Sequence, residues 1–578
     1  MTNFQSIWFS VLVASPAAIS LLVLALSVIG FRRSGGSNGD QPRLVPGNHW
    51  LTRLMGLQAI ASWASLFSWL VAVGFSSGRV PDSLPVGSGV TWSLGGVTVL
   101  LFDGVSLLMM TLVSSIGWVI CRYSMRYLHG ERNQHRYFRW TTFTITAVAW
   151  MVLSGNLAIF IAGWMATSLG LHRLLLHYPE RAAARRAAWT KFSISRIGDV
   201  TLILASFLLL SELGSLNFQA MFAAAASLAD GTIPLSVQVA SALLIVSAIT
   251  KSAQFPLHTW LPLTMETPTP VSALMHAGIV NAGGFLIIRH SPILSLVPTS
   301  LLVLASIGAA TVIYAAVVMT TQTSIKKRLA YSTIAQMGFM MLQCGVGAYS
   351  AAMLHILAHS MYKAHAFLSS GGAISDAALA RTSTARPNGG ISPNAILRML
   401  VSLAVLLAIM TTAFGWMGMS MASKPGGWLL GGVLLSGLGL WNLKAAMWFG
   451  NAGWTRALSA SAMLTISYVV CFCSVDAIVS GHVGMAPSNS ATLVVSGFIL
   501  VGIVLAGWLS IVARGDSELS VSRRVWVHAA NGFYLESVLR RVFVSRRNGH
   551  ASSGPGSGTS EPVTWKSSSP AGAALSRL

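Results

Sequence analysis

Long apolar segments recur along almost the whole of this 578-residue chain. A helix needs about 20 mostly apolar residues to cross a bilayer, and inside hydrocarbon it satisfies its own backbone hydrogen bonds. The composition agrees with that setting, since 54% of the residues are hydrophobic and only 9% are charged, whereas soluble domains carry about 25% charge. The sequence therefore predicts an all-α, polytopic membrane helix bundle of about fifteen transmembrane helices, some of them discontinuous.

Hydropathy also gives approximate positions for these helices. The first apolar run lacks a basic leader and a small-residue cleavage site, so we expect no cleavable signal peptide. The predicted spans are residues 8–31, 54–77, 98–121, 138–155, 157–177, 192–212, 236–256, 269–290, 297–320, 328–347, 350–373, 395–415, 427–449, 456–480 and 491–513.

The net charge of +22 comes largely from basic residues that follow odd-numbered spans. Cytoplasmic loops carry an excess of Lys and Arg, so this distribution predicts an outside N-terminus and a cytoplasmic C-terminus. Attraction to anionic lipid accounts for the remaining charge, and we expect no binding to nucleic acid. The residues concerned are Arg32, Arg33 and Arg43; Arg122, Arg126, Arg132, Arg136 and Arg139; Arg181, Arg185, Arg186 and Lys191; Lys326, Lys327 and Arg328; and Arg381 and Arg386.

Lys251 lies in an apolar span, where a charge costs a few kcal/mol. Pro256 follows five residues later, removes an amide donor and so breaks or kinks the helix. Pro268 and Pro270 mark a second interruption shortly before His276. Broken helices occur at membrane depth where they are enclosed by protein or line a wet cavity. We interpret Lys251, the helix breaks and His276 as part of an ion pathway.

A second group of titratable side chains, His355, His359 and Lys363, is spaced at i, i+4 and i+8. This spacing drifts only about 40° per step, so the three share one helix face. They extend over about 12 Å along the axis. Histidine titrates near neutrality and a desolvated lysine can also exchange its proton, so the row predicts a proton path through intervening waters. The alternative is that the histidines only form hydrogen bonds across a helix interface.

Neither the histidines nor the four cysteines form a clear metal-binding pattern. Two histidines at i, i+4 can chelate zinc, but there is no H-E-x-x-H glutamate or third ligand, and Lys363 would repel a cation. No pattern for a nucleotide, haem or iron–sulfur cluster appears either. We predict no catalytic residue, metal or cofactor in this chain, with a self-contained zinc enzyme as the alternative.

Several other charged residues lie in or beside apolar segments. Lys444 is either the exit lysine of the pathway or a side chain that extends to the membrane interface. Asp103 and Asp199 are considered as partners of pathway lysines or of basic loop residues, and Asp199 also as a local partner of Arg196. Glu266 is a third possible ion-pair partner, although an acid also suits a helix start. Asp476 receives no role.

Several motifs carry a family resemblance. The segments Lys251–Pro262, Pro268–Ala277 and Lys327–Gly338 resemble the antiporter-like membrane subunits of respiratory complex I and Mrp-type antiporters. Phe102–Leu107 and Ser195–Asp199 extend the resemblance over roughly residues 95–375. It implies a proton half-channel chain formed by Lys251, His276, His355, His359 and Lys363.

One motif of the complex I subunits differs in this chain. The complex I subunits carry Gly-Trp-Glu, whose glutamate pairs with the lysine of the seventh span, whereas this chain reads Gly163-Trp164-Met165. Met275–Leu286 and Val527–Tyr534 are similar to the DabB membrane subunits of DAB-type inorganic carbon transporters. That similarity implies a bacterial inner-membrane protein whose cation flux, of protons or sodium, drives CO2 hydration on a DabA-like cytoplasmic partner with a carbonic-anhydrase-like zinc site. An Mrp or complex I type antiporter subunit is the alternative.

These features divide the chain into five regions. Residues 1–94 hold N-terminal transmembrane helices and a loop, 95–375 the antiporter-like proton-translocating core, and 376–514 the C-terminal transmembrane helices. Residues 515–548 form a basic amphipathic segment expected at the cytoplasmic membrane surface. Residues 549–578 are rich in Ser, Gly and Pro and are expected to be disordered.

Overall fold

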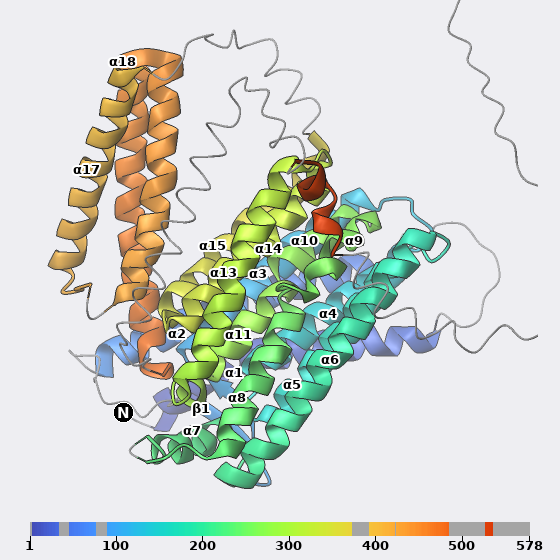
Figure 1. Ribbon diagram of the computed structural model, residues 1–578. Helices are drawn as coiled ribbons and strands as arrows, with labels where there is room; N and C mark the ends of the chain where they lie inside the picture. The colour runs from blue at the N-terminus through green and yellow to red at the C-terminus, as the bar shows by residue number, and fades with distance from the viewer. Residues whose placement is uncertain are drawn as a thin grey trace, which may run out of the picture. The chain divides into compact units, whose positions relative to one another are not determined.

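The computed structural model is built almost entirely of helices (Figure 1). It describes residues 3–33, 46–76, 90–229, 231–372, 392–421, 424–484 and 526–535. The longer helices are α1 (Asn3–Arg33), α2 (Pro46–Ser76), α3 (Gly104–Tyr127), α4 (Gln134–Leu153), α5 (Leu157–Leu175), α6 (Ala182–Leu213), α8 (Leu235–Lys251), α13 (Pro298–Thr321), α14 (Ile325–Gly345), α15 (Tyr349–Leu368), α17 (Pro393–Trp416) and α18 (Pro425–Val479).

Shorter elements connect these helices. One is a β-hairpin, β1 (Val90–Leu94) and β2 (Val97–Phe102). The others are α7 (Phe218–Ala226), η1 (Leu257–Thr259), α9 (Trp260–Leu263), η2 (Thr264–Glu266), α10 (Thr269–Ala277), η3 (Ile279–Asn281), α11 (Ala282–Arg289), α12 (Ser291–Leu294), η4 (Ser370–Gly372), η5 (Ser480–His482) and η6 (Gly532–Tyr534), with one further helical turn at 526–530.

The helix pattern predicted from hydropathy is present. Each predicted span from 8–31 to 456–480 overlaps a helix of the structure. Of the described helices, eight are long and apolar enough to cross a membrane. α18 covers two predicted spans, which Gly450 separates because its backbone (φ 61°, ψ −144°) leaves the helical conformation. The last predicted span, 491–513, and the tail 549–578 lie outside the described residues.

Two predicted boundaries are wrong. The span predicted to start at residue 98 begins as strand β2, and α3 starts only at Gly104, where the Asp103 side chain accepts a hydrogen bond from the Ser106 amide as a helix N-cap. The basic residues expected in a loop after the fifth span instead form the first turns of α6, which starts at Ala182. Arg and Lys are good helix formers, so their charge did not mark the end of a helix.

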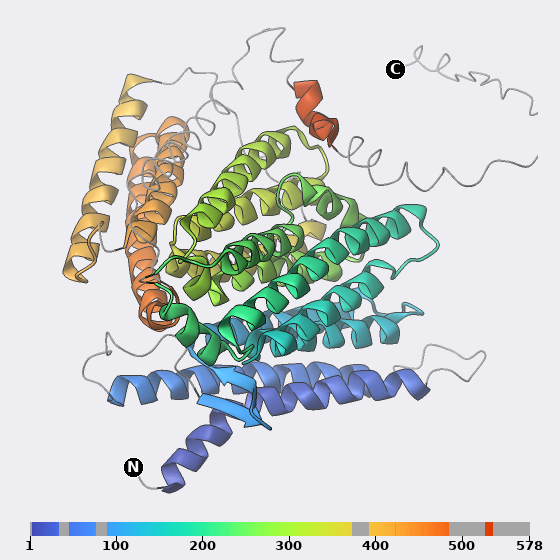
Figure 2. The ribbon, with the colours of Figure 1, turned by 60° about the horizontal axis from the view of Figure 1, so that its bottom comes forward.

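The β-hairpin is hydrogen-bonded to neighbouring turns of the helix bundle. Its strands pair antiparallel around a turn in which Gly95 and Gly96 have positive φ (57° and 82°). Figure 2 shows the two strands as blue arrows beside the N-terminal helices. Asn217, just before α7, accepts hydrogen bonds from the Thr98 amide and from the Asn156 side chain, and it donates one to the Gly96 carbonyl. One asparagine therefore joins the hairpin to the turns before α5 and α7.

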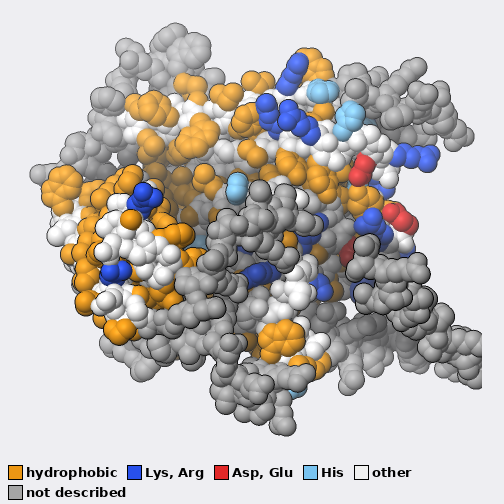
Figure 3. All heavy atoms as spheres, turned by 90° about the horizontal axis from the view of Figure 1, so that it is seen from above, with side chains coloured by type: hydrophobic (Ala, Val, Ile, Leu, Met, Phe, Trp, Pro, Cys, Tyr) orange, Lys and Arg blue, Asp and Glu red, His pale blue; other side chains and the backbone are white. Residues whose placement is uncertain are grey.

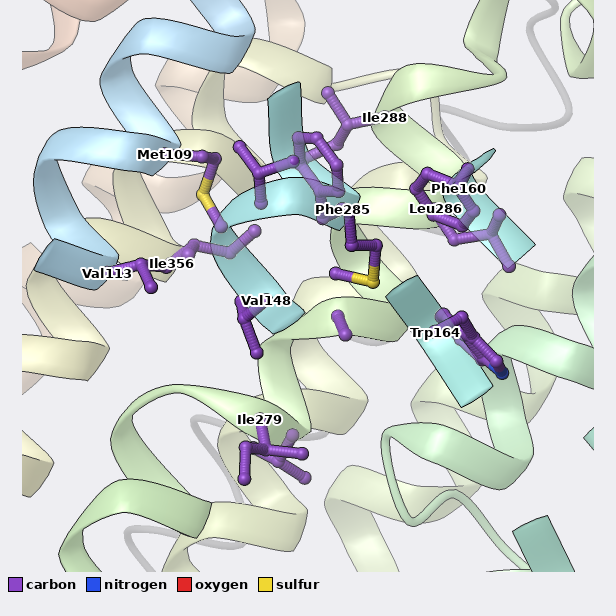
Figure 4. Packing of buried hydrophobic residues seen from close by; sticks show 14 of the residues in the cluster. Met109, Val113, Val148, Phe160, Trp164, Ile279, Phe285, Leu286, Ile288 and Ile356 are labelled. Carbon is purple, nitrogen blue, oxygen red and sulfur yellow. The ribbon is translucent and has the colours of Figure 1, made fainter. Parts of the chain in front are cut away.

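In a membrane the hydrophobic effect does not drive helices together, so close packing depends on small residues at the helix contacts. At the α13–α14 contact, Gly308 and Gly338 face each other's backbone, and a Cβ on either would overlap it. Gly198 similarly brings α6 against the Thr250 hydroxyl on α8. Such contacts, with the buried hydrophobic side chains of Figure 4, hold the pathway helices in register. A separate hydrophobic cluster joins α17 and α18 around Phe414.

Hydrophobic side chains also cover much of the outside. Figure 3, which views the molecule from the top of Figure 1, shows them among scattered Lys, Arg and His. Exposed large side chains on α2 include Ile60, Trp63 and Phe67. Such a surface suits a lipid environment.

Candidate ion pathway

The first part of the site is the end of α8. Lys251 is the last residue of α8, and beyond it Ala253 has a positive φ of 51° before Pro256 and the short helix η1. The Lys251 side chain is only 4% exposed. Its Nζ donates to the Trp164 carbonyl (3.1 Å) and the Ser168 hydroxyl (3.0 Å) of α5 and lies 4.3 Å from the Trp164 ring centre. The ammonium is held by two oxygens and an aromatic face.

The carboxylate that acts on Lys251 comes from α6. Asp199 is buried and pairs with Arg196 across 2.6 Å, the local partner considered above, and it also attracts Lys251 electrostatically. Met165 is half-buried and packs against the hydrophobic core. Asp199 is thus the acid described beside Lys251, on a different helix from Met165.

Lys191 is a further buried lysine that the sequence interpretation assigned to a basic loop. That assignment is wrong: Lys191 lies ten residues into α6, is 2% exposed, and its Nζ donates to the Ser168 carbonyl (3.0 Å). Hydropathy missed it because it stands at the edge of an apolar run, beside Arg185 and Arg186.

The second part of the site is an interrupted helix. Pro268 precedes α10, Pro270 lies in its first turn, and helical structure breaks at Gly278 before resuming in α11. His276 is fully buried, and its Nδ1 is 3.0 Å from the Thr333 hydroxyl. That hydroxyl also donates to the Leu329 carbonyl (3.1 Å), and Nε2 of His276 has no hydrogen-bond partner among the described residues.

Hydrogen bonds join the two breaks to α15. Ser252 donates to the Val280 carbonyl (2.7 Å), which is at the α10–α11 interruption. The Asn281 side chain donates to the Ala277 carbonyl (2.9 Å) and to the Ser360 hydroxyl (2.7 Å), next to His359. A continuous series of contacts therefore runs from the Lys251 break to the histidine row.

The row predicted from spacing does share one buried face of α15. His355, His359 and Lys363 are at most 7% exposed, whereas His365 is exposed. Lys363 donates to the Ser332 hydroxyl (2.8 Å) and to the Leu329 carbonyl (3.2 Å), the same carbonyl that binds Thr333. His276 and Lys363 are thereby linked through α14.

The two histidines of the row differ in their partners. His355 is bound at both ring nitrogens by glutamine side chains of α14, Gln343 (2.9 Å) and Gln336 (2.8 Å). His359 lies 6.1 Å from His355, ring centre to ring centre, and neither of its nitrogens has a hydrogen-bond partner among the described residues. Buried polar atoms usually bind water where no protein group reaches them. His359 is therefore suited to pass a proton to water.

The other acidic candidates do not join this series. Asp103 forms a two-point ion pair with Arg289 of α11 (2.6 and 3.1 Å), so its partner is neither a pathway lysine nor a loop residue. Sequence reasoning missed Arg289, although a charge within a predicted span was the available signal. Glu266 is exposed and takes part in none of the ion pairs of the described residues.

The remaining charged residues lie on α18 or beside it. Lys444 is exposed, and no hydrogen bond or ion pair of the described residues joins it to the pathway. Asp476 pairs with Lys424 (2.9 Å). Within the described ranges, no group of three or more His, Cys, Asp or Glu side chains could hold a metal ion.

Known proteins are similar to this chain in sequence. A family described as NADH:quinone oxidoreductase/Mrp antiporter, TM, matches residues 154–449, and one described as complex I chain 5 N-terminus matches 97–138. The probable inorganic carbon transporter subunit DabB2 of Halothiobacillus neapolitanus is 35% identical over 474 residues, 80% of this chain and 82% of its own. The chain belongs to the DabB family. It is therefore an antiporter-like, ion-translocating membrane subunit.

Other relatives agree with this assignment. A probable DabB of Hydrogenovibrio crunogenus is 41% identical over 281 residues, 48% of this chain and 54% of its own. NADH-quinone oxidoreductase subunit L of Escherichia coli is 36% identical over 359 residues, 61% of this chain and 57% of its own. The fold resembles the Mrp complex of Dietzia sp. (TM-score 0.51, 21% identity, 94% of this chain and 57% of that one). This chain thus shares its fold with a subunit of the Mrp complex.

Proposed function

We propose that this chain conducts protons as the membrane subunit of an inorganic carbon uptake complex, and that the flux drives CO2 hydration on a zinc-containing partner. The observation that carries the proposal is a series of buried titratable side chains. Lys251 and His276 lie at two helix breaks, and His359 and Lys363 share one face of α15. The names of the DabB relatives supply inorganic carbon as the transported material.

The chemistry of the site favours protons over sodium. A sodium ion needs several oxygen ligands, such as carbonyls of unwound helices. The groups that follow one another here are ammonium and imidazole groups, which repel a metal cation when protonated and exchange a proton readily. The hydroxyls of Ser168, Ser332 and Thr333 lie within hydrogen-bond distance of them and can relay protons.

The proposal also covers orientation and partners. We infer an inner-membrane chain whose C-terminus is cytoplasmic and whose core, residues 95–375, contains the pathway, with Lys444 as a candidate for its exit. A DabA-like zinc subunit would dock on cytoplasmic basic turns, including Lys326 and Lys327. The Gln322 side chain donates to the Ala530 carbonyl (3.4 Å), which supports a surface formed by residues 526–531 beside the α13–α14 turn.

The decisive variants are at Lys251. Lys251→Ala should abolish growth that depends on the complex at ambient CO2 because the proton has no carrier at the first break. Lys251→Arg should also fail, since arginine keeps its charge and hydrogen bonds but does not release the proton. Growth and inorganic carbon uptake are the measurements, with the amount of chain in the membrane determined by immunoblot.

Arg456→Gln is the control, because Arg456 is an exposed basic residue of α18 outside the pathway and the docking surface. Wild-type uptake by the Lys251→Arg variant would contradict proton exchange at this residue and assign it a fixed-charge role.

An Mrp or complex I type antiporter subunit is the second candidate, supported by the identity with subunit L. Purification of the intact complex separates the two. A zinc-bearing soluble partner supports carbon uptake, whereas a set of small membrane subunits supports the antiporter. Zinc bound to the isolated chain would support the enzyme alternative.

A further inference from the structure

Lys191 is a buried titratable group that the pathway above does not use. It lies on α6, which packs against both α5 and α8. Both buried lysines bind the same residue: Lys191 Nζ donates to the Ser168 carbonyl, and Lys251 Nζ donates to the Ser168 hydroxyl, each over 3.0 Å. Ser168 itself is fully buried. The two ammonium groups thus meet on one serine of a third helix.

The charges around this serine do not balance if both lysines are protonated. Lys191 and Lys251 repel each other, and Arg196 repels both. Asp199 is the acidic group that attracts them, and it already pairs with Arg196 at 2.6 Å. An uncompensated charge is expensive to bury. The arrangement is therefore most stable when no more than one of the two lysines is protonated.

We propose that Lys191 is a second proton carrier, which shares a single proton with Lys251 across Ser168. When the Lys191 ammonium loses its proton, the neutral Lys251 amine gains it, so the charge of the pair stays at one. The inference rests on the proposed proton pathway and extends it toward the turn between α5 and α6.

His172 connects Lys191 with that turn. It is one helical turn beyond Ser168 on α5, is 7% exposed, and its Nδ1 is 3.2 Å from the Ala188 carbonyl on α6. Lys191 and His172 also interact electrostatically. Protons from the predicted cytoplasmic side would thus reach Lys191 before Lys251, with Asp199, Arg196 and His172 as the charged groups that face it.

The test uses intact cells that contain the whole complex and measures the initial rate of inorganic carbon uptake as a function of pH. Lys191→Gln should lower the rate by about a hundredfold, the scale on which a positioned proton-transfer group acts. Lys191→Arg should fail equally, although it retains the charge and a donor to the Ser168 carbonyl. Lys191→His should keep part of the rate, with its pH profile moved toward the acidic range in which imidazole holds a proton.

The controls separate this inference from the function on which it rests. Full uptake with an unchanged pH profile in Lys191→Arg would overturn the proton-carrier role and assign Lys191 a structural charge. Full uptake in Lys191→Gln would overturn it as well, provided that Lys251→Gln is inactive. If Lys251→Gln is also fully active, the proposed pathway itself fails. Arg456→Gln, a variant of an exposed basic residue on α18, should match the wild type.

Discussion

The residues of the pathway differ in how firmly their side chains are held. His355 is fixed at both ring nitrogens, while His359 has no protein partner on either. In the proposed pathway, His359 is therefore the side chain of this row best placed to exchange a proton with water.

His359→Ala should reduce inorganic carbon uptake by about a hundredfold, because the relay loses a proton-transfer group. His365→Ala, ten residues after His355 and exposed, should stay within about twofold of the wild type, as surface substitutions usually do. Uptake rates normalised to the chain in the membrane test both. Equal losses at the two positions would contradict the one-face arrangement.

At the scale of elements, an ion pair attaches the second half of the interrupted helix to α3. Asp103 accepts two hydrogen bonds from Arg289, and the same arginine reaches the Ser106 hydroxyl. The carboxylate also caps α3 through the Ser106 amide (2.8 Å), while His482 of η5 lies within electrostatic range. The pair fixes where α11 lies while the break at Gly278 remains unwound.

Asp103→Ala should destabilise the protein by about 3–5 kcal/mol, because it leaves the Arg289 charge buried without a partner. Thermal unfolding of the purified protein measures the change. Adding Arg289→Met to Asp103→Asn should recover part of the loss seen in Asp103→Asn alone, because the unpaired charge is removed. Strictly additive losses would contradict a direct interaction between the two side chains.

At the scale of the whole molecule, the chain is expected to couple proton flux to inorganic carbon uptake and not to hydrate CO2 itself. An ionophore that collapses the proton gradient should stop bicarbonate accumulation by the assembled complex, since proton flux is its proposed driving force. Uptake of labelled inorganic carbon, with and without ionophore, is the measurement. Continued accumulation in fully depolarised cells would contradict the coupling, as would saturable CO2 hydration by the purified chain with bound zinc.

The sequence by itself determined the helices and the face of α15 that carries His355, His359 and Lys363. Both follow from residues close together in the sequence. The length of an apolar run predicts a membrane-spanning helix, and residues four positions apart lie on the same face of a helix. Lys251 was recognisable for the same reason, since it is a charge within an apolar run. The start of α3 was not recognisable, because a short apolar run fits a strand or a helix. The first turns of α6 were not recognisable either, because their basic residues suit a helix as well as a loop.

Only the tertiary structure decided which charged groups meet. The partner of Asp103 lies 186 residues away, Lys191 is buried with its Nζ bound to the Ser168 carbonyl of α5, and Ser252 reaches the second break across 28 residues. Local sequence does not encode these distances, because they depend on how helices pack against one another and on the small residues that let them approach. The helices are thus set by local chemistry, and the contacts of the proposed proton path are set by the packing of those helices.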